Sequence, residues 1–348
     1  MPESMEQSAR NEWRKIVSRY QRPDPRRAMT QIATTLLPLA AGFYLMYRSL
    51  VLPYWATLLL AIPTAGLLVR TFIIMHDCAH GSFLPWKRTN SLIGWITGVL
   101  TMTPFAQWRR DHALHHASSG DLDRRGHGDV DTLTVREYLA LSRRARIGYR
   151  LRRNPLVLFG IGPLVFLITN RIPPRDPSAS RQEHVSVWAT NAIILALLWA
   201  TAAWIGWQAV LLMYLPAIYL AAAAGIWLFY VQHQFEDTYW KEHAEWDYAT
   251  SAIRGSSYLK LPGVLRWFTG SIGLHHVHHL GPRIPNYALE RCYAENPLFH
   301  EVTVLTLTES VRTLRLTLWD EARQRLVGFR DVAALATAHQ GFDATPNS

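Results

Sequence analysis

The chain has 348 residues, 49% of them hydrophobic, a formal net charge of +10 and only two cysteines, Cys78 and Cys292. Two distant cysteines exclude a disulfide-stapled scaffold. The hydrophobic residues form long blocks with basic residues between them, so a membrane-facing protein explains the positive charge better than a nucleic-acid-binding one.

The first 27 residues form a basic N-terminal segment, with seven Lys or Arg against four acidic residues. They lack the apolar core that a cleavable signal peptide requires. We therefore expect this segment to stay in the cytoplasm, ahead of a membrane domain at residues 28–340.

Four apolar segments of the membrane domain are long enough to cross a bilayer about 30 Å thick at about 1.5 Å per residue. They are residues 30–47, 53–75, 185–204 and 208–231. The region between His80 and His184 carries sixteen Lys or Arg and eight acidic residues, whereas the link at 205–207 carries no charge. The positive-inside rule then predicts two helical hairpins with both termini in the cytoplasm, in a bacterial inner membrane.

Two shorter apolar segments, residues 91–105 and 155–169, are predicted to be interfacial or re-entrant, because neither is long enough for a full span. The chain from Gln232 onward is predicted to be helical, with a loop at 281–287, and residues 341–348 read as a frayed tail. The predicted fold class is an all-α integral membrane protein: four transmembrane helices with a cytoplasmic helical cap.

Three histidine clusters stand out, one with the spacing HxxxH at 76–80 and two with the spacing HxxHH at 112–116 and 275–279. Residues three and four apart are neighbours on a helix, so each cluster presents imidazoles together. The predicted topology brings all three to the cytoplasmic side, together with His233 at the end of the last span. The candidate metal ligands are His76, His80, His112, His115, His116, His233, His275, His278 and His279.

This many imidazoles exceeds the three or four protein ligands of one zinc ion, so we expect two metal ions. Imidazole suits zinc, copper, iron and nickel alike, so the ligand type does not choose the metal. A metal pair at the mouth of an apolar bundle has a lipid-like substrate as its neighbour. Attack on an unactivated C–H bond requires an oxygen-activating metal, which favours iron with O2 as co-substrate.

Four acidic residues adjoin the histidines, and a metal-bound histidine usually donates its second N–H to a carboxylate or carbonyl. We expect Asp77, Asp111, Glu236 and Asp237 to orient the ligands, although each could instead be a solvated charge. His276 lies between ligands, should point elsewhere on the turn, and is a candidate supporting residue.

These residues resemble the integral-membrane fatty acid desaturases, and the flanking sequences resemble the acyl-lipid, omega-type branch. The resemblance extends to WRRDHALHH (108–116), GDLDRRGHGDVDTLTVREY (120–138), HQFEDTYW (233–240) and HHVHHLGPRIPNY (275–287). It implies a non-haem di-iron centre on the nine histidines and an O2-dependent reaction that leaves a cis double bond in an acyl chain. It also implies an external electron donor, a ferredoxin.

One position departs from the acyl-CoA branch of that family, which places an Asn one helical turn before the histidine at the end of the last span. This chain has Phe229 there. The resemblance thus implies a lipid-linked substrate and disfavours acyl-CoA or an acyl carrier protein.

Three alternatives stay open. A related di-iron hydroxylase or carotenoid ketolase would share the histidine spacing. A membrane zinc hydrolase or transporter would differ in its metal, although the spans carry few ionisable residues for an ion path. A non-catalytic membrane scaffold would not depend on the histidines for its function.

Overall fold

The computed structural model describes residues 12–126 and 130–332. The first eleven residues of the basic N-terminal segment and the predicted tail at 341–348 lie outside the described residues. From residue 12 to residue 18 the N-terminal segment is helical, and Val17 of this helix and Tyr20 of the turn after it are buried.

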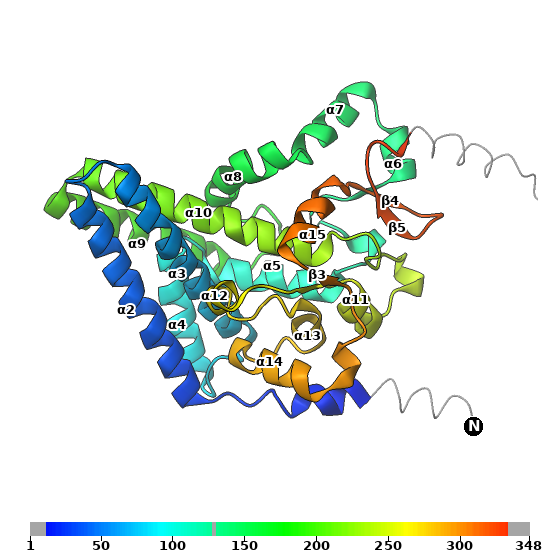
Figure 1. Cartoon of the computed structure of the whole chain (residues 1–348), viewed down its shortest axis with the longest axis horizontal. Coiled ribbons are helices and arrows are strands. Elements are labelled where there is room, and N and C mark those ends of the chain that lie inside the picture. Colours follow the sequence, from blue (N-terminus) through cyan, green and yellow to red (C-terminus); the bar gives the residue numbers. More distant parts are fainter. Residues whose placement is uncertain (1–11, 127–129, 333–348) are drawn as a thin grey trace, which may run out of the picture.

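Four helices in the described part of the chain are long and apolar enough to cross a membrane. They are α2 (Pro25–Ser49), α3 (Trp55–His80), α9 (Arg181–Ile205) and α10 (Trp207–His233). Helices α2, α9 and α10 contain the predicted segments 30–47, 185–204 and 208–231, whereas α3 begins two residues after the predicted start at 53 and extends five residues beyond the predicted end at 75. In Figure 1 the turns after α2 and α9 lie at the same end of the molecule, at the upper left.

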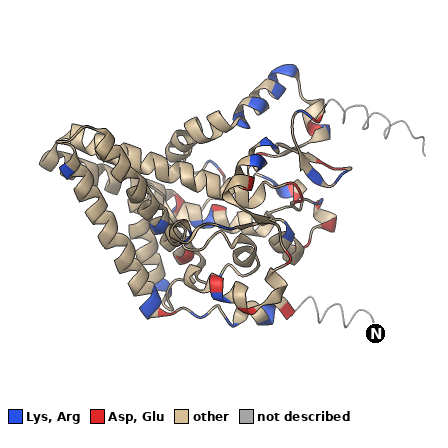
Figure 2. Ribbon diagram, viewed as in Figure 1, with Lys and Arg blue, Asp and Glu red and all other residues tan. Residues whose placement is uncertain are grey.

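Helix α3 is the most buried of the four, because it packs against α2, α10 and the shorter α4 (Lys87–Leu100). The outer helices α2, α9 and α10 expose large apolar side chains, such as Leu37, Trp199 and Leu215, as lipid-facing helices do. Figure 2 shows few charged residues along these long helices and many on the remaining part of the molecule. The helices that could span a membrane therefore combine exposed apolar side chains with few charges.

Helices α5 (Phe105–Ser118) and α6 (Val135–Ala140) come next in the chain. Two further helices, α7 and α8, follow them and form a bent pair. Helix α7 (Arg143–Arg152) is followed by a π-helical turn, Val157–Ile161, and α8 (Gly162–Thr169), with a bend of 60° at the break. Pro155 lies in this break, where its ring and missing N–H favour a new helix start over continuation of the old one. The pair could be a broken fifth span or a re-entrant segment.

The region after α10 contains α11 (Tyr248–Arg254), α12 (Gly263–Phe268), α13 (His275–Leu280), α14 (Asn286–Glu295) and α15 (Leu307–Arg312). It also contains short strands, which the prediction of a helical region with a loop at 281–287 did not include. Strand β2 (Tyr258–Leu259) pairs in parallel with β3 (Val304–Leu305). Strand β4 (Leu318–Asp320) lies between β1 (Leu133–Thr134), which is parallel, and β5 (Arg325–Val327), which is antiparallel. Strands of two or three residues are too short for a detectable alternation of polar and apolar residues.

A buried apolar cluster attaches this region to the long helices. It includes Val17 and Tyr20 of the N-terminal segment, Ile73 of α3, Val277 of α13 and Leu289 of α14. The third histidine cluster lies on α13, so this packing holds it beside the end of α3, which carries the first cluster. Gly81 ends α3 in a left-handed conformation (φ 66°) directly after His80, which suits glycine because it has no Cβ.

Candidate metal centre

All nine predicted ligands lie in two adjacent groups, and within each group the potential ligand atoms are within 4.8 Å of one another. The five-histidine group contains His76 and His80 of α3, His112 and His116 of α5, and His278 of α13. The four-histidine group contains His115 of α5, His233 of α10, and His275 and His279 of α13. Four helices that are distant in sequence thus converge at one place.

Each HxxHH cluster divides between the two groups. On α5, His112 and His116 are four residues apart, share a face and join the five-histidine group, whereas His115 joins the other. On α13 the assignment is reversed. His275 and His279, which are four residues apart, belong to the four-histidine group, and His278 belongs to the five-histidine group. The rings of His116 and His279 stack across the boundary with centroids 4.2 Å apart. Both short helices therefore serve both groups.

Burial keeps five of these imidazoles neutral. Loss of hydration, followed by repulsion from neighbouring imidazoles, lowers the pKa of five histidines on α5 and α13 well below its usual value of 6.5; they are His112, His116, His275, His278 and His279. Neutral imidazole is the form that binds a metal ion. These five rings are therefore in the form that binds a metal ion at neutral pH.

Hydrogen bonds at the outer nitrogens orient two of the rings. His233 Nδ1 is 3.0 Å from the carbonyl oxygen of Gly255, which can only accept, so Nδ1 carries the proton. His76 Nδ1 is 3.0 Å from Asp77 Oδ1, a carboxylate that also accepts two N–H groups from Asn286. In both rings Nε2 is left with a lone pair directed into its group.

The inner nitrogens are too close together for hydrogen bonding to account for all the contacts. His233 Nε2 lies 3.2 Å from His115 Nε2 and 3.0 Å from His275 Nε2. His278 Nε2 likewise has two imidazole nitrogens near it, at 3.1 and 3.0 Å. A neutral imidazole nitrogen either donates one proton or accepts one, so one atom does not satisfy two such neighbours. Imidazole nitrogens gathered this closely would fit around a shared metal ion at bonds of roughly 2.1 Å.

Two further buried nitrogens, His80 Nε2 and His279 Nε2, have no hydrogen-bond partner among the residues that the structure describes. A buried polar atom without a partner carries a desolvation cost that a metal ion would remove. The donor set, its spacing and these two atoms all fit two imidazole-bound metal ions.

Comparison with known proteins identifies the family. The model of the family "Fatty acid desaturase" matches residues 49–305, which include every histidine of both groups. The chain belongs to this family. It is 44% identical over 319 residues to a fatty acid desaturase of Bacillus subtilis, and the match covers 91% of this chain and 90% of that protein.

More distant relatives are omega-3 desaturases. An sn-1 acyl-lipid omega-3 desaturase (ferredoxin) of Synechocystis is 27% identical over 63% of this chain and 61% of that protein. An sn-2 acyl-lipid omega-3 desaturase (ferredoxin), chloroplastic, of Helianthus annuus is 28% identical over 76% of this chain and 60% of that protein. This chain therefore covers about three fifths of the length of these two relatives.

The acidic residues expected to orient the ligands lie in different surroundings in the structure. Asp77 is buried and contacts His76. Glu236 is exposed and forms an ion pair with Arg325 at 3.0 Å, and Asp237 is also exposed. Asp111 is half-buried on α5. Of these four, Asp77 is the carboxylate with a contact to a candidate ligand that the structure specifies.

His276 lies outside both groups, as its position between the ligands suggested. Its ring is fully buried among Tyr258, Tyr293 and Phe299, and its Nε2 is 3.1 Å from the Phe299 carbonyl oxygen. Burial lowers the pKa of His276 to about 4, so the ring is neutral. It anchors the chain after α14 to α13 and so supports the ligands on either side of it.

The sequence assigned no role at the site to four other residues, of which three contact a histidine of the groups and one, Asn286, contacts Asp77. Trp108 stacks on His112 at 4.3 Å between ring centroids, and the Phe229 centroid is 5.0 Å from that of His115. Gly255 and Asn286 supply the carbonyl and the N–H groups described above. Trp108 lies one helical turn before His112, which is a usable sequence signal. Gly255 offers none, because its contribution is a backbone oxygen.

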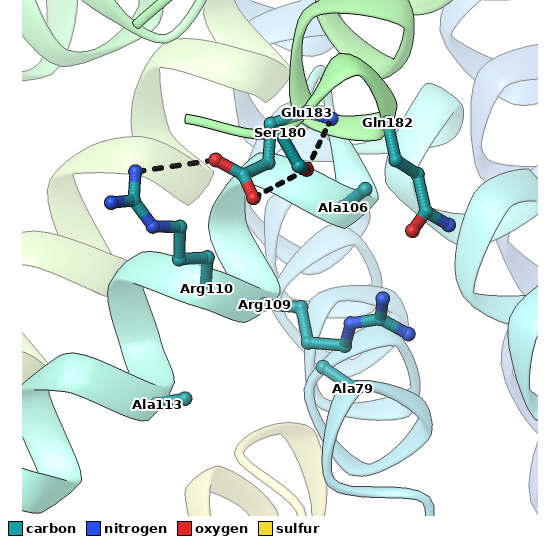
Figure 3. Close-up of a pocket in the computed structure, with 8 residues that line it drawn as sticks. All are labelled: Ala79, Ala106, Arg109, Arg110, Ala113, Ser180, Gln182 and Glu183. Carbon is teal, nitrogen blue, oxygen red and sulfur yellow. Dashed lines mark hydrogen bonds and ion pairs between the residues drawn. The ribbon is translucent and has the colours of Figure 1, made fainter. Parts of the chain in front are cut away.

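A cavity of about 340 Å³ lies between α3, α5 and the start of α9 (Figure 3). Ala79 and Ala113 line it, and they are the chain neighbours of His80 and His112, the two half-buried members of the five-histidine group. In Figure 3, Arg110 pairs with Glu183 at 3.2 Å, while the Arg109 guanidinium extends away from that pair. The five-histidine group therefore has an open region beside it, whereas the four-histidine group is wholly buried.

Proposed function

We propose that this protein is a membrane fatty acyl desaturase that uses O2 and a non-haem di-iron centre to introduce a cis double bond into a lipid-linked acyl chain. One observation carries the proposal: nine imidazoles from α3, α5, α10 and α13 form two groups of metal-ligand spacing, in a chain of the desaturase family. A methylene chain offers no bond to hydrolyse, so the substrate of such a site requires redox chemistry.

In this proposal the five-histidine and four-histidine groups each hold one iron ion, and bound iron supplies the activation of O2 that C–H cleavage requires. The overall reaction removes two hydrogens from adjacent carbons, and two electrons and two protons from outside complete the reduction of O2 to two waters. The protein's own residues do the positioning. Asp77 and the Gly255 carbonyl hold His76 and His233 with Nε2 free for the metal.

The two electrons require a separate donor, and we propose a ferredoxin. Two relatives whose names specify ferredoxin support this choice. We place the approach of the donor at the cavity lined by Ala79 and Ala113, because these residues are the chain neighbours of His80 and His112. Arg109 on its edge would attract an acidic carrier.

The proposed orientation places both termini and the metal centre on the cytoplasmic side of a bacterial inner membrane. The charge distribution along the sequence supports it through the positive-inside rule. The substrate acyl chain would then reach the histidines from the cytoplasmic half of the bilayer.

Fatty acid analysis of a heterologous host tests the proposal. The host should lack polyunsaturated lipids and be supplied with saturated and monounsaturated chains, with the wild-type protein and His115→Ala compared at equal expression. We expect new double bonds by mass spectrometry with the wild type and none with the variant. Hydroxyl or keto products without alkenes would instead identify a hydroxylase or ketolase, and zinc in place of iron in the purified protein would favour a hydrolase or transporter.

A further inference from the structure

Asp77 is a buried carboxylate on α3, and Asn286 donates two hydrogen bonds to one of its oxygens. The backbone N–H of Asn286 donates to Asp77 Oδ2 at 2.6 Å, and its side-chain amide donates to the same oxygen at 2.8 Å. The other oxygen, Oδ1, accepts the Nδ1 proton of His76 at 3.0 Å. Asp77 and Asn286 are only 2% and 3% exposed, so water does not substitute for these contacts.

This arrangement suits an ionised carboxylate and holds it in one orientation. A buried charge is costly unless hydrogen-bond donors satisfy it, and charge-assisted hydrogen bonds are the stronger kind. Two of the three donors come from Asn286. It is also the first residue of α14, so the favourable end of a ten-residue helix dipole faces the negative charge.

The segment that carries Asn286 is itself fixed in place. The hydroxyl of the next residue, Tyr287, accepts the N–H of Asp24 at 2.8 Å and donates to the Phe83 carbonyl at 3.1 Å. Asp24 caps the start of α2, and Phe83 follows the end of α3. The start of α14 is therefore tied to two of the long helices, and the Asn286 side chain is held against Asp77.

We propose that Asn286 is a positioning residue for the metal centre. It holds the Asp77 carboxylate, which in turn holds His76 with its Nε2 directed into the five-histidine group. The inference rests on the proposed function, because it assumes that this group binds iron. It adds a residue from the 281–287 segment, for which the proposed chemistry has no other use.

The test measures iron binding by the full-length protein in detergent. Iron(II) content per chain and the apparent affinity in competition with a chelator are compared for wild type, Asn286→Ala and Asn286→Asp, and gel filtration monitors folding. Loss of an outer hydrogen-bond partner of a metal ligand typically weakens metal affinity about 10- to 100-fold, which is the expectation for Asn286→Ala. Asn286→Asp keeps the size of the side chain but places a second carboxylate against Asp77, so we expect a larger loss.

Asn296→Ala is the matched control. Asn296 is also buried, directly follows α14, and donates to Tyr20 at 2.9 Å and to the Cys292 carbonyl at 2.7 Å, away from the metal ligands. We expect this variant to lose packing stability but to keep the iron affinity of the wild type. Equal losses of iron in the two alanine variants would reduce the role of Asn286 to general stability and overturn the inference.

A double-mutant cycle covers the case in which one variant folds poorly. If Asn286 acts through Asp77, then Asn286→Ala in an Asp77→Asn background should lower iron affinity little further, because residues of one network are not additive. Additive losses would overturn the inference, as would an Asn286→Asp variant with wild-type iron affinity. A wild-type chain that binds no iron overturns the proposed function itself, and the inference with it.

Discussion

The two histidine groups use the same ligand but differ in their surroundings. The five-histidine group has two half-buried members beside a cavity, and the anionic Asp77 orients one of its ligands. The four-histidine group is wholly buried, and a neutral carbonyl, that of Gly255, orients His233. Phe229 packs on this second group, with ring centroids 5.0 Å from His115 and 5.4 Å from His233.

This difference indicates that two metal ions bound here would not be equivalent. A carboxylate partner makes an imidazole a more basic ligand than a carbonyl partner does, so the five-histidine group has both more ligands and a stronger one. The cavity lies on its side, while an aromatic ring covers part of the four-histidine group. Tighter binding and easier access are therefore expected at the same group.

Removal of a ligand should have the largest effect, and it should differ between the groups. His279→Ala leaves three imidazoles in its group, whereas His80→Ala leaves four in the other. We expect both to lower desaturation on the order of 10³-fold or more, since members of one catalytic unit fail together. Metal analysis should show that His279→Ala loses more iron. Equal iron contents in the two variants would contradict the asymmetry.

Removal of the charge that supports the five-histidine group should have a smaller effect. Asp77→Asn keeps the size of the side chain but removes the negative charge beside His76, and we expect desaturation and iron affinity to fall about 10- to 100-fold. Glu236→Gln is the matched control, because Glu236 also adjoins a histidine in sequence but is exposed and paired with Arg325. An exposed ion pair contributes little, so its turnover should stay within about 2-fold of the wild type. A stronger effect of Glu236→Gln than of Asp77→Asn would be incompatible with these contacts.

The smallest expected effect concerns the order in which the metals leave. A water-soluble chelator added to the iron-loaded protein reaches the five-histidine group more easily, because two members of that group are half-buried. The tighter binding expected at the same group would slow the loss of its iron. We expect access to govern the early phase and the chelator to remove iron in two phases with rate constants that differ several-fold. Phe229→Ala should bring the slow phase closer to the fast one, because it uncovers the four-histidine group. The measurement is the absorbance of the iron–chelator complex against time. A single phase in the wild type would indicate that the two groups are equally accessible.

Much of this organisation follows from local sequence patterns. Residue runs long enough for a bilayer predicted the four long helices, because a buried or lipid-facing backbone must be helical over its whole length. The HxxxH and HxxHH spacings, together with His233 at a helix end, predicted all nine histidines that the structure gathers into the two groups. Helical periodicity carries this information because it depends on neighbours three and four residues away.

Other features depended on contacts between distant segments, which no local pattern specifies. The sequence did not indicate that His115 would join the group of His233 and not that of His112 and His116. Asp77 and Glu236 each lie near a histidine in the sequence, yet Asp77 is part of a buried network and Glu236 lies on the surface. The short strands, Gly255 and Asn286 were missed for the same reason. By itself the sequence determined which imidazoles were available, because their spacing follows from one helix. Only the packing of α3, α5, α10 and α13 decided which of them share a site, because that requires four helices to meet.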